Sequence, residues 1–304
     1  MGRSRAGPFS RRLTQKSKPL NHYRGLMESR AEWVVGLPSS RLALFIDRYV
    51  GYRTTGFAPG VHRGLPSRHM TFIVSVGPSI DVVSQTNSEQ MPESYACVLS
   101  GLQASPALIS HDGNQEGVAI ELTPLGCRAL FAMPSSALWN SSFEFGDVAG
   151  GAGRELWERI QGLDAWSDRF AACDEVLTRL ANGNTAVAPE LDHAWRTLVN
   201  AGGMASISAV AASVGWSRQY LARRFTDEFG LGPKLAARVM RFERARHMLE
   251  ARPSFVTIAQ VAATCGYFDQ AHLNRDFAEL AGCTPTAWLA EVFPSFQDAG
   301  AIAV

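Results

Sequence analysis

Between Ile207 and Trp288, the spacing of apolar residues predicts the same pair of short helices twice. In the first copy, apolar residues recur at helical spacing from Ile207 onward, a Gly-Trp break follows, and a second helix begins after Ser217. The second copy begins at Ile258, and its second helix begins after Asp269. Ser and Asp are favoured residues before a helix, because their side-chain oxygens accept a hydrogen bond from a free backbone N–H. The pattern therefore predicts two helix-turn-helix units.

The second helix of each unit has an apolar side and a polar side. Leu221 and Phe225 lie four residues apart, as do Leu273 and Phe277, so each pair faces inward from one side of its helix. The outward positions carry guanidinium and carboxamide groups, which suit contacts in a DNA major groove. A further helix, Lys234 to Leu249, connects the two units and spans about 24 Å at 1.5 Å per residue.

Three runs of residues carry a family resemblance: Ile207 to Phe225, Arg241 to Leu249, and Ile258 to Pro285, the last ending in Gly-Cys-Thr-Pro. These runs are similar to the DNA-binding domain of AraC/XylS-family transcription regulators, and they cover about a third of the chain. The resemblance implies seven helices in two subdomains. It also implies that two recognition helices enter successive major grooves about one helical turn, ~34 Å, apart.

From Glu32 to about Asn114 the pattern changes to short apolar runs that are separated by Gly, Pro and Ser. Examples are the runs at 69–76 and 95–99, and a further run follows at 117–122. Short strands at regular spacing predict a small β-sandwich or barrel.

The stretch Leu125 to Pro134, the following Leu138-Trp139-Asn140 and an acidic residue at Asp147 are similar to one subgroup of the cupin-like sensory domains of AraC-type regulators. This subgroup is poorly characterised, and the resemblance brings no known ligand with it. From Gly153 to Leu180 helical spacing returns. By resemblance these helices are expected to make homodimer contacts, whereas their spacing is equally consistent with helices that cover an open face of the sheet.

The expected fold class is α+β with two domains: a β-rich cupin-like barrel with C-terminal helices, and then an all-α DNA-binding domain with two helix-turn-helix subdomains. The expected divisions are a basic, disordered tail at 1–30, a cupin-like sensory and dimerisation domain at 31–182, a linker at 183–189, an AraC-type DNA-binding domain at 190–292 and a flexible tail at 293–304.

The distribution of charge adds to this picture. The 304 residues carry a net charge of +1, but eight basic residues against one acidic residue give 1–30 a charge of +7. In 205–249, eight basic residues against three acidic residues give +5. A basic recognition region favours attraction to phosphates. The first thirty residues lack the core of a signal peptide, and no later run is long enough to span a membrane, so we expect a cytoplasmic, nucleoid-associated protein without a membrane partner.

Several kinds of catalytic or metal site are not supported by the sequence. His62, His69 and His111 lack the closely spaced pair that a metal cupin uses, so we predict no metal site. The five cysteines never form the close pairs of zinc or redox motifs, although a redox role stays open for Cys97. No nucleophile triad, phosphate loop or carboxylate pair is recognisable. We therefore expect neither a cofactor nor an enzyme.

The candidate site residues lie in the two helix-turn-helix units. Arg suits guanine, and Gln or Asn suits adenine, whereas contacts to phosphates position a protein without reading sequence. Ser217 and Asp269 are expected to cap their helices, and Arg241 to brace the connecting helix by pairing with acids. The expected base contacts are Arg218, Gln219, Arg223, Gln270, Asn274 and Arg275. The expected phosphate contacts are Tyr220, Arg224, Lys234 and His272.

The expected function is a sequence-specific transcription regulator that reads two adjacent major-groove segments and is modulated by a small ligand in its N-terminal domain. Its expected partners are double-stranded DNA, RNA polymerase, a small-molecule effector and a second copy of the chain through helices in 153–181. One alternative is an AraC-type regulator without a small-molecule effector, controlled by its abundance or by a protein partner. A remote alternative is a cupin-type enzyme fused to a DNA-binding domain.

Overall fold

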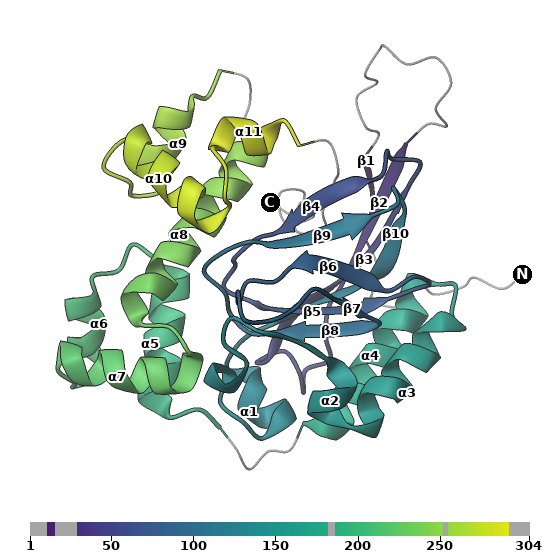
Figure 1. Ribbon diagram of the computed structural model, residues 1–304. Coiled ribbons are helices and arrows are strands. Elements are labelled where there is room, and N and C mark those ends of the chain that lie inside the picture. Colours follow the sequence, from purple (N-terminus) through teal and green to yellow (C-terminus); the bar gives the residue numbers. More distant parts are fainter. Residues whose placement is uncertain (1–10, 16–28, 182–185, 252–254, 292–304) are drawn as a thin grey trace, which may run out of the picture.

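The computed structural model describes residues 11–15, 29–181, 186–251 and 255–291, and it has a β-rich N-terminal half and a helical C-terminal half (Figure 1). The larger sheet has seven strands. Their spatial order is β1 (Arg11–Gln15), β2 (Arg30–Gly36), β3 (Ile46–Thr55), β10 (Gln115–Leu122), β5 (Met70–Ser75), β8 (Cys97–Ser100) and β11 (Ser142–Glu144). All of these pairs are antiparallel. The predicted runs at 69–76, 95–99 and 117–122 correspond to β5, β8 and β10.

A second, smaller sheet faces the first. Its four strands are β4 (Gly60–Gly64), β9 (Ala107–His111), β6 (Ile80–Ser84) and β7 (Glu93–Tyr95), in that spatial order. One buried cluster joins the two sheets and includes Tyr52 and Ile73 from the larger sheet and Ile80 and Ile109 from the smaller one. The two sheets therefore form a sandwich with a core between them, as the regular spacing of short strands predicted.

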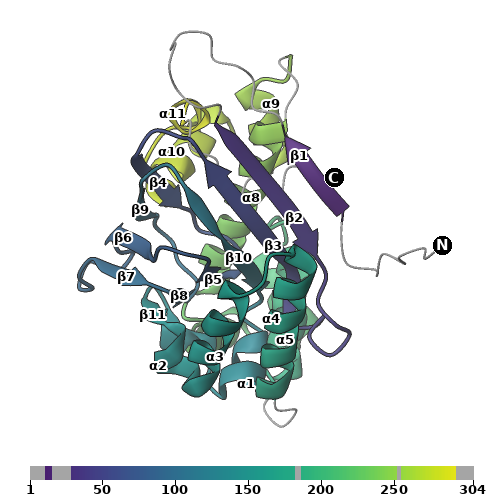
Figure 2. The same ribbon diagram turned by 90° about the vertical axis from the view of Figure 1, so that its right-hand side faces the viewer.

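Helices follow the last long strand and cover the outer face of the larger sheet (Figure 2). They are α1 (Gly126–Phe131), the 3₁₀ helix η1 (Ser135–Leu138), α2 (Phe145–Ala149), α3 (Gly151–Gln161) and α4 (Trp166–Leu180). Gly36 of β2 leaves room for the ring of Phe170 of α4, since a Cβ at Gly36 would lie 2.4 Å from that ring. The buried sides of α3 and α4 pack in the core, so the apolar spacing in Gly153–Leu180 serves the sheet. A homodimer through these helices stays a prediction.

Seven helices make up the described part of the chain from 189 to 289, in agreement with the family resemblance. They are α5 (Pro189–Asn200), α6 (Ile207–Ser213), α7 (Arg218–Phe229), α8 (Pro233–Ala251), α9 (Ile258–Thr264), α10 (Gln270–Leu280) and α11 (Pro285–Leu289). Helices α6 and α7 form the first helix-turn-helix unit, and α9 and α10 the second. Helix α8 lies between them and packs against both α7 and α10.

The N-terminal stretch differs from expectation. We expected disorder over residues 1–30, but Arg11–Gln15 forms β1, which pairs with β2 in antiparallel register from Arg11 opposite Val35 to Gln15 opposite Ala31. Without β1, strand β2 would be an edge with unpaired backbone N–H and C=O groups, which readily pair with another strand. Residues 1–10 and 16–28 of the expected tail lie outside the described residues, as do the tail expected at 293–304 and part of the expected linker.

The two halves share their cores. One buried cluster runs from the larger sheet through Leu138 of η1 to Phe225 and Phe229 of α7. The core of the second helix-turn-helix unit contains Leu65, which follows β4. The expected division at 183–189 is therefore a division along the chain, while apolar packing continues across it.

Gly230 lies where the two halves pack closely together and provides a test of this packing. Its φ of 83° is left-handed, and a Cβ there would lie 2.4 Å from Cβ of Trp139, whereas Gly215 has a φ of 71° and open space around it. We expect Gly215→Ala to lower the free energy of unfolding by about 1–2 kcal/mol through backbone strain alone. Gly230→Ala should lower it by about 1–3 kcal/mol more, because the new methyl group also displaces Trp139. Urea unfolding measures both losses, and equal losses would contradict this packing.

Candidate functional site

The second helix of each unit begins at a side-chain cap. The side chain of Ser217 accepts a hydrogen bond from the backbone N–H of Tyr220 at 3.2 Å, and Asp269 accepts one from His272 at 2.7 Å. These bonds use backbone donors that have no partner within the helix. The structure thus places both caps where the sequence suggested them, and the cap in each unit orients the start of α7 or α10.

The side chains expected to contact bases lie mainly on the outside of these two helices. Arg218, Gln219 and Arg223 of α7 are exposed, as are Gln270 and Arg275 of α10, while Asn274 is half-buried. Among the described residues, no carboxylate forms an ion pair with any arginine of this set. Cations that are not neutralised by the protein itself are available to phosphates or base edges.

An aromatic pair supports Arg223. Its guanidinium lies over the ring of Tyr220, 5.3 Å from the ring centre, and Tyr220 meets Trp216 edge-on at 4.9 Å. A guanidinium over an aromatic face is weakly attracted to it. The arrangement limits the directions that Arg223 takes while leaving its N–H donors exposed.

The expected phosphate contacts are not all alike. Arg224 and Lys234 are exposed, and Tyr220 is 40% exposed. His272 is half-buried, its Nδ1 accepts a hydrogen bond from the backbone N–H of Phe268 at 3.4 Å, and its ring meets Tyr267 edge-on at 5.1 Å. The ring of His272 therefore supports the turn before α10, which leaves Nε2 as its free nitrogen for a phosphate.

The bracing role expected of Arg241 has to be corrected. Arg241 donates to the carbonyl of Gly203 at 3.1 Å and lies 5.9 Å from the ring centre of Tyr267, and no ion pair joins it to an acid of the described chain. The ion-pairing role belongs to Arg238, which bonds to Asp276 at 2.7 Å and to Glu279. Arg238 lies about one helical turn before Arg241 on α8, and it is Arg238 that contacts the acids of α10.

Phe268 is a feature that the sequence interpretation passed over. In the first unit the cap residue, Ser217, is the second residue after Gly215. In the second unit the cap residue, Asp269, is the third residue after Gly266. The aromatic residue after each glycine packs inward, and the additional residue of the second turn is Phe268, which is 93% exposed. The difference in turn length between the copies was the signal that could have identified it.

The opposite, C-terminal end of α7 is held by the β domain. The hydroxyl of Ser135 donates to the carbonyl of Glu228 at 3.2 Å, and that of Ser136 donates to the carbonyl of Asp227 at 2.6 Å. Arg128 of α1 bonds to the buried Glu228 carboxylate at 2.7 Å. The last carbonyls of a helix lack partners within it; η1 supplies partners for two of them, and α1 binds the side chain of Glu228.

The C-terminal end of α10 is held in a similar way by strand β4. Arg63 donates from Nη1 to the carbonyl of Ala281, the residue that ends α10, at 3.1 Å, and from Nε to the carboxylate of Glu291 at 2.6 Å. Sequence spacing gave no sign of either anchor. The β domain therefore holds the C-terminal ends of both helices, and their capped N-terminal ends remain exposed.

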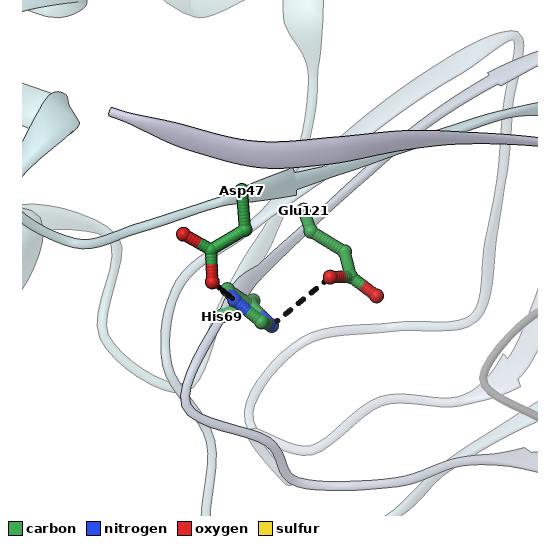
Figure 3. Close-up of side chains that lie close together, drawn as sticks. All are labelled: Asp47, His69 and Glu121. Atoms are coloured by element: carbon green, nitrogen blue, oxygen red, sulfur yellow. Dashed lines mark hydrogen bonds and ion pairs between the residues drawn. The ribbon is translucent and has the colours of Figure 1, made fainter. Parts of the chain in front are cut away.

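A cluster of ionisable groups lies in the β domain beside α8. Figure 3 shows the ring of His69 between two carboxylates, with Nε2 2.7 Å from Asp47 and Nδ1 3.8 Å from Glu121. Burial alone would raise the pKa of Asp47, but the hydrogen bond and charge of His69, together with Arg68, lower it to about 2. Burial likewise opposes ionisation of Glu121, but His69 and Arg48 outweigh it and lower its pKa.

The same cluster reaches across to α8. Arg68 bonds to the buried carboxylate of Glu243 at 3.3 Å, and Arg48 bonds to Glu121 at 2.7 Å. Asp47, His69 and Glu121 come within 4.8 Å of one another, which is close enough to consider a metal ion. The two carboxylates, however, face different nitrogens of one ring, and arginines already neutralise both. The arrangement is that of an ion-pair network which joins the β domain to α8, and residues so far apart in sequence gave no metal-binding pattern to recognise.

A cavity lies between the two sheets and is partly open to solvent. Most of its lining is apolar, and none of the described residues that line it is Asp, Glu, Lys or Arg. The lining residues are Tyr52, His62, Gly64, Thr71, Ile73, Ile80, Val82, Val98, Ser100, Gln103, Ala107, Ile109, Gln115 and Ser142.

Several polar side chains line the cavity, and some of them are bonded within the protein. The hydroxyls of Ser100 and Ser142 bond to each other at 2.9 Å, and Gln103 donates to the carbonyl of Gly64 at 3.0 Å. Burial, with a further contribution from His111, lowers the pKa of His62 to about 4, so this ring is neutral near pH 7. The fold thus brings His62 and His111 together, with ring centres 5.6 Å apart, which their sequence separation did not suggest.

The cysteines behave as small hydrophobic residues. Cys97, Cys127, Cys173 and Cys265 are buried, and Cys283 is half-buried. Burial raises the pKa of every one of these thiols. Because thiolates and not thiols react readily with oxidants, the redox role left open for Cys97 has no support in its surroundings.

Comparison with known families agrees with this geometry. Residues 210–291 match the family described as a helix-turn-helix domain, and residues 35–144 match a domain of unknown function, DUF6597. No curated protein matches the chain. None of the described helices combines the length and hydrophobicity that crossing a membrane requires.

Solved structures with a similar fold include three regulators. The C-terminal domain of AraT, a response regulator from Geobacillus stearothermophilus, is 21% identical, with 36% of this chain and 89% of that chain covered and a TM-score of 0.32. An AraC-type regulator from Chromobacterium violaceum is 23% identical over 38% and 94% of the two chains, with a TM-score of 0.30. ToxT from Vibrio cholerae is 13% identical over 79% and 97%, with a TM-score of 0.47. At these scores no ligand or partner carries over to this chain.

The fold and the two capped helices define a class of domain: a duplicated helix-turn-helix domain, whose fold is typical of proteins that bind DNA. Residues 210–291 of this chain form a helix-turn-helix domain, and residues 35–144 form a DUF6597 domain.

Proposed function

We propose that the protein binds one face of double-stranded DNA by placing α7 and α10 in two adjacent major grooves. The observation that carries this proposal is that both helices expose polar and cationic side chains at capped N-terminal ends, while their C-terminal ends are held by one and the same β domain. In helix-turn-helix proteins the N-terminal residues of the second helix contact base edges. Two such helices on one rigid support can read a bipartite site.

Within this proposal the side chains divide into two groups. Base contacts come from Arg218, Gln219 and Arg223 on α7 and from Gln270, Asn274 and Arg275 on α10, whose donors and acceptors match guanine and adenine edges. Phosphate contacts come from Tyr220, Arg224, Lys234 and the free side of His272. The latter group adds affinity for any DNA sequence and makes binding dependent on salt.

We further propose that a small molecule in the N-terminal domain modulates DNA binding, and that RNA polymerase and a second copy of the chain are partners. The cavity between the sheets supports a small-molecule effector, because a mostly apolar concave site with a few polar groups is the usual form of such sites. The domain divisions expected from the sequence belong to the same proposal, with the sensory part at 31–182 and the DNA-binding part at 190–292.

Arg223→Ala tests direct reading of bases. It should weaken binding to an operator selected by the wild-type protein by about 1–3 kcal/mol, the value of one bidentate base contact. Binding to random-sequence DNA should change little. The neighbouring Arg224→Ala is the matched control and should weaken both kinds of DNA to a similar degree and reduce the salt dependence by about one contact. Titrations at several salt concentrations measure these effects, and an equal loss on both DNAs for Arg223→Ala would contradict base reading there.

Phe268→Ser tests whether the additional residue of the second turn contacts DNA. Burying an exposed aromatic ring against a thymine methyl group or a sugar stabilises a complex by about 1.5–3 kcal/mol, so the variant should bind the operator about tenfold more weakly. Phe255, which is 80% exposed before α9, supplies the control, and Phe255→Ser should leave affinity unchanged. Neither substitution should alter the melting temperature. Equal affinities of the two variants would show that Phe268 does not contact DNA.

A further inference from the structure

Strand β4 has a different partner on each of its faces. His62 and Gly64 line the cavity between the sheets, whereas Arg63, which lies between them, bonds to Ala281 and Glu291 of the second helix-turn-helix unit. This follows from strand geometry, because successive side chains point to opposite faces. The strand is therefore both a wall of the cavity and the support of the anchor that holds α10.

The position of β4 in its sheet allows it to respond to an occupant. In the described sheet order β4 is an edge strand that pairs only with β9, from Gly60 opposite His111 to Gly64 opposite Ala107. An edge strand is hydrogen-bonded along one side, and such elements open and shift at lower cost than central strands. A shift of β4 carries the backbone of Arg63 with it.

The opposite side of the cavity leads to the other anchor. Ser142, which lines the cavity, follows Trp139 by three residues, and Trp139 packs on Gly230 at the end of α7. Gly101 follows the lining residue Ser100 and packs against the backbone of Leu138. A Cβ on Gly101 would lie only 1.9 Å from the carbonyl oxygen of Leu138. The cavity thus lies between the segment that holds α7 and the strand that holds α10.

The lining defines the chemistry of an occupant. No charged side chain of the described chain lines the cavity, and its serine hydroxyls and the amide of Gln103 are already bonded within the protein. The ring of His62 is neutral near pH 7. A carboxylate, phosphate or ammonium group would lose its hydration here without gaining an opposite charge, which is costly. An uncharged, mostly apolar molecule loses little and gains contact with the isoleucine and valine side chains.

We propose that an uncharged, mostly apolar small molecule binds in the cavity between the sheets and shifts β4, and that Arg63 passes this shift to α10. The inference rests on the proposed function, in which α7 and α10 read two half-elements of one site. Because η1 holds α7 separately, the occupant changes the placement of α10 relative to α7. The occupant therefore changes the affinity of the protein for DNA that carries both half-elements. It does so because the occupant binds one arrangement of α7 and α10 more tightly than the other.

The first experiment determines the class of ligand with probes that differ only in charge. The full chain is heated with hexanol, cyclohexanol or benzyl alcohol, and with the matched anions hexanoate, cyclohexanecarboxylate or benzoate. At least one alcohol should raise the melting temperature in a dose-dependent way, and its matched anion should not. Ala107→Leu, which fills the cavity from its lining, should abolish the rise and so locate the probe. The proposed ligand class would be overturned if an anion stabilised the protein as much as its matched alcohol. It would also be overturned if none of the alcohols raised the melting temperature.

The second experiment follows the path through Arg63. The affinity for a selected two-element operator should change about fivefold or more with the bound alcohol, the lower end of ordinary coupling between sites. Arg63→Met removes both bonds to the second unit and should abolish this change while the alcohol still raises the melting temperature. Arg179→Met is the control: it removes an exposed ion pair between α4 and α3, and the alcohol should still change the operator affinity of this variant.

The outcomes separate the inference from the proposed function. A coupling of equal size in wild type and Arg63→Met would overturn the path through β4, even if the alcohol binds. Operator binding without any probe is measured in the same titrations, so absence of sequence preference in the wild type would reject the proposed function itself. If Arg63→Met melts below the assay temperature, Arg63→Lys replaces it, since lysine lacks the fork that bonds two partners at once.

Discussion

The arrangement of this protein depends on the way that its β domain holds the C-terminal ends of two helices. The last carbonyls of a helix have no partner within it, and here Ser135 and Ser136 bond to those of α7 while Arg63 bonds to that of α10. The N-terminal ends are capped by Ser217 and Asp269 and remain exposed. Both helices are thereby fixed at the end that faces the protein and open at the end that can face DNA.

This constraint makes the two halves of the chain one mechanical unit. Apolar packing continues from the larger sheet to α7, and the network of Arg68 with Glu243 joins the sheet to α8. A buried ion pair often adds little net stability, but removing one partner leaves the other charge buried and unpaired. The relative placement of α7 and α10 therefore depends on the β domain, and a change in the sandwich, such as a displacement of β4, alters what the two helices can bind together.

The sequence predicted the parts of this structure that depend on local patterns. Helical spacing and the residues Ser217 and Asp269 located both helix-turn-helix units, and short apolar runs located strands such as β5 and β10. The anchors could not be found in this way, because Arg63 and Ala281 are 218 residues apart and Arg128 and Glu228 are 100 residues apart. Strand β1 was missed because its polar residues resemble a solvated tail, and its pairing depends on the free edge of β2. The role expected of Arg241 was wrong because packing determines which arginine of α8 meets the acids of α10, and that arginine is Arg238.

The most direct test of this account is selection of DNA from a random library by the full-length protein. If the β domain holds α7 and α10 as two readers of adjacent major grooves, the selected sequences should share two half-elements whose centres lie about 10–10.5 base pairs apart, at one fixed spacing. A single half-element, two half-elements at variable spacing, or no common sequence would contradict the claim that both helices read DNA from one rigid support.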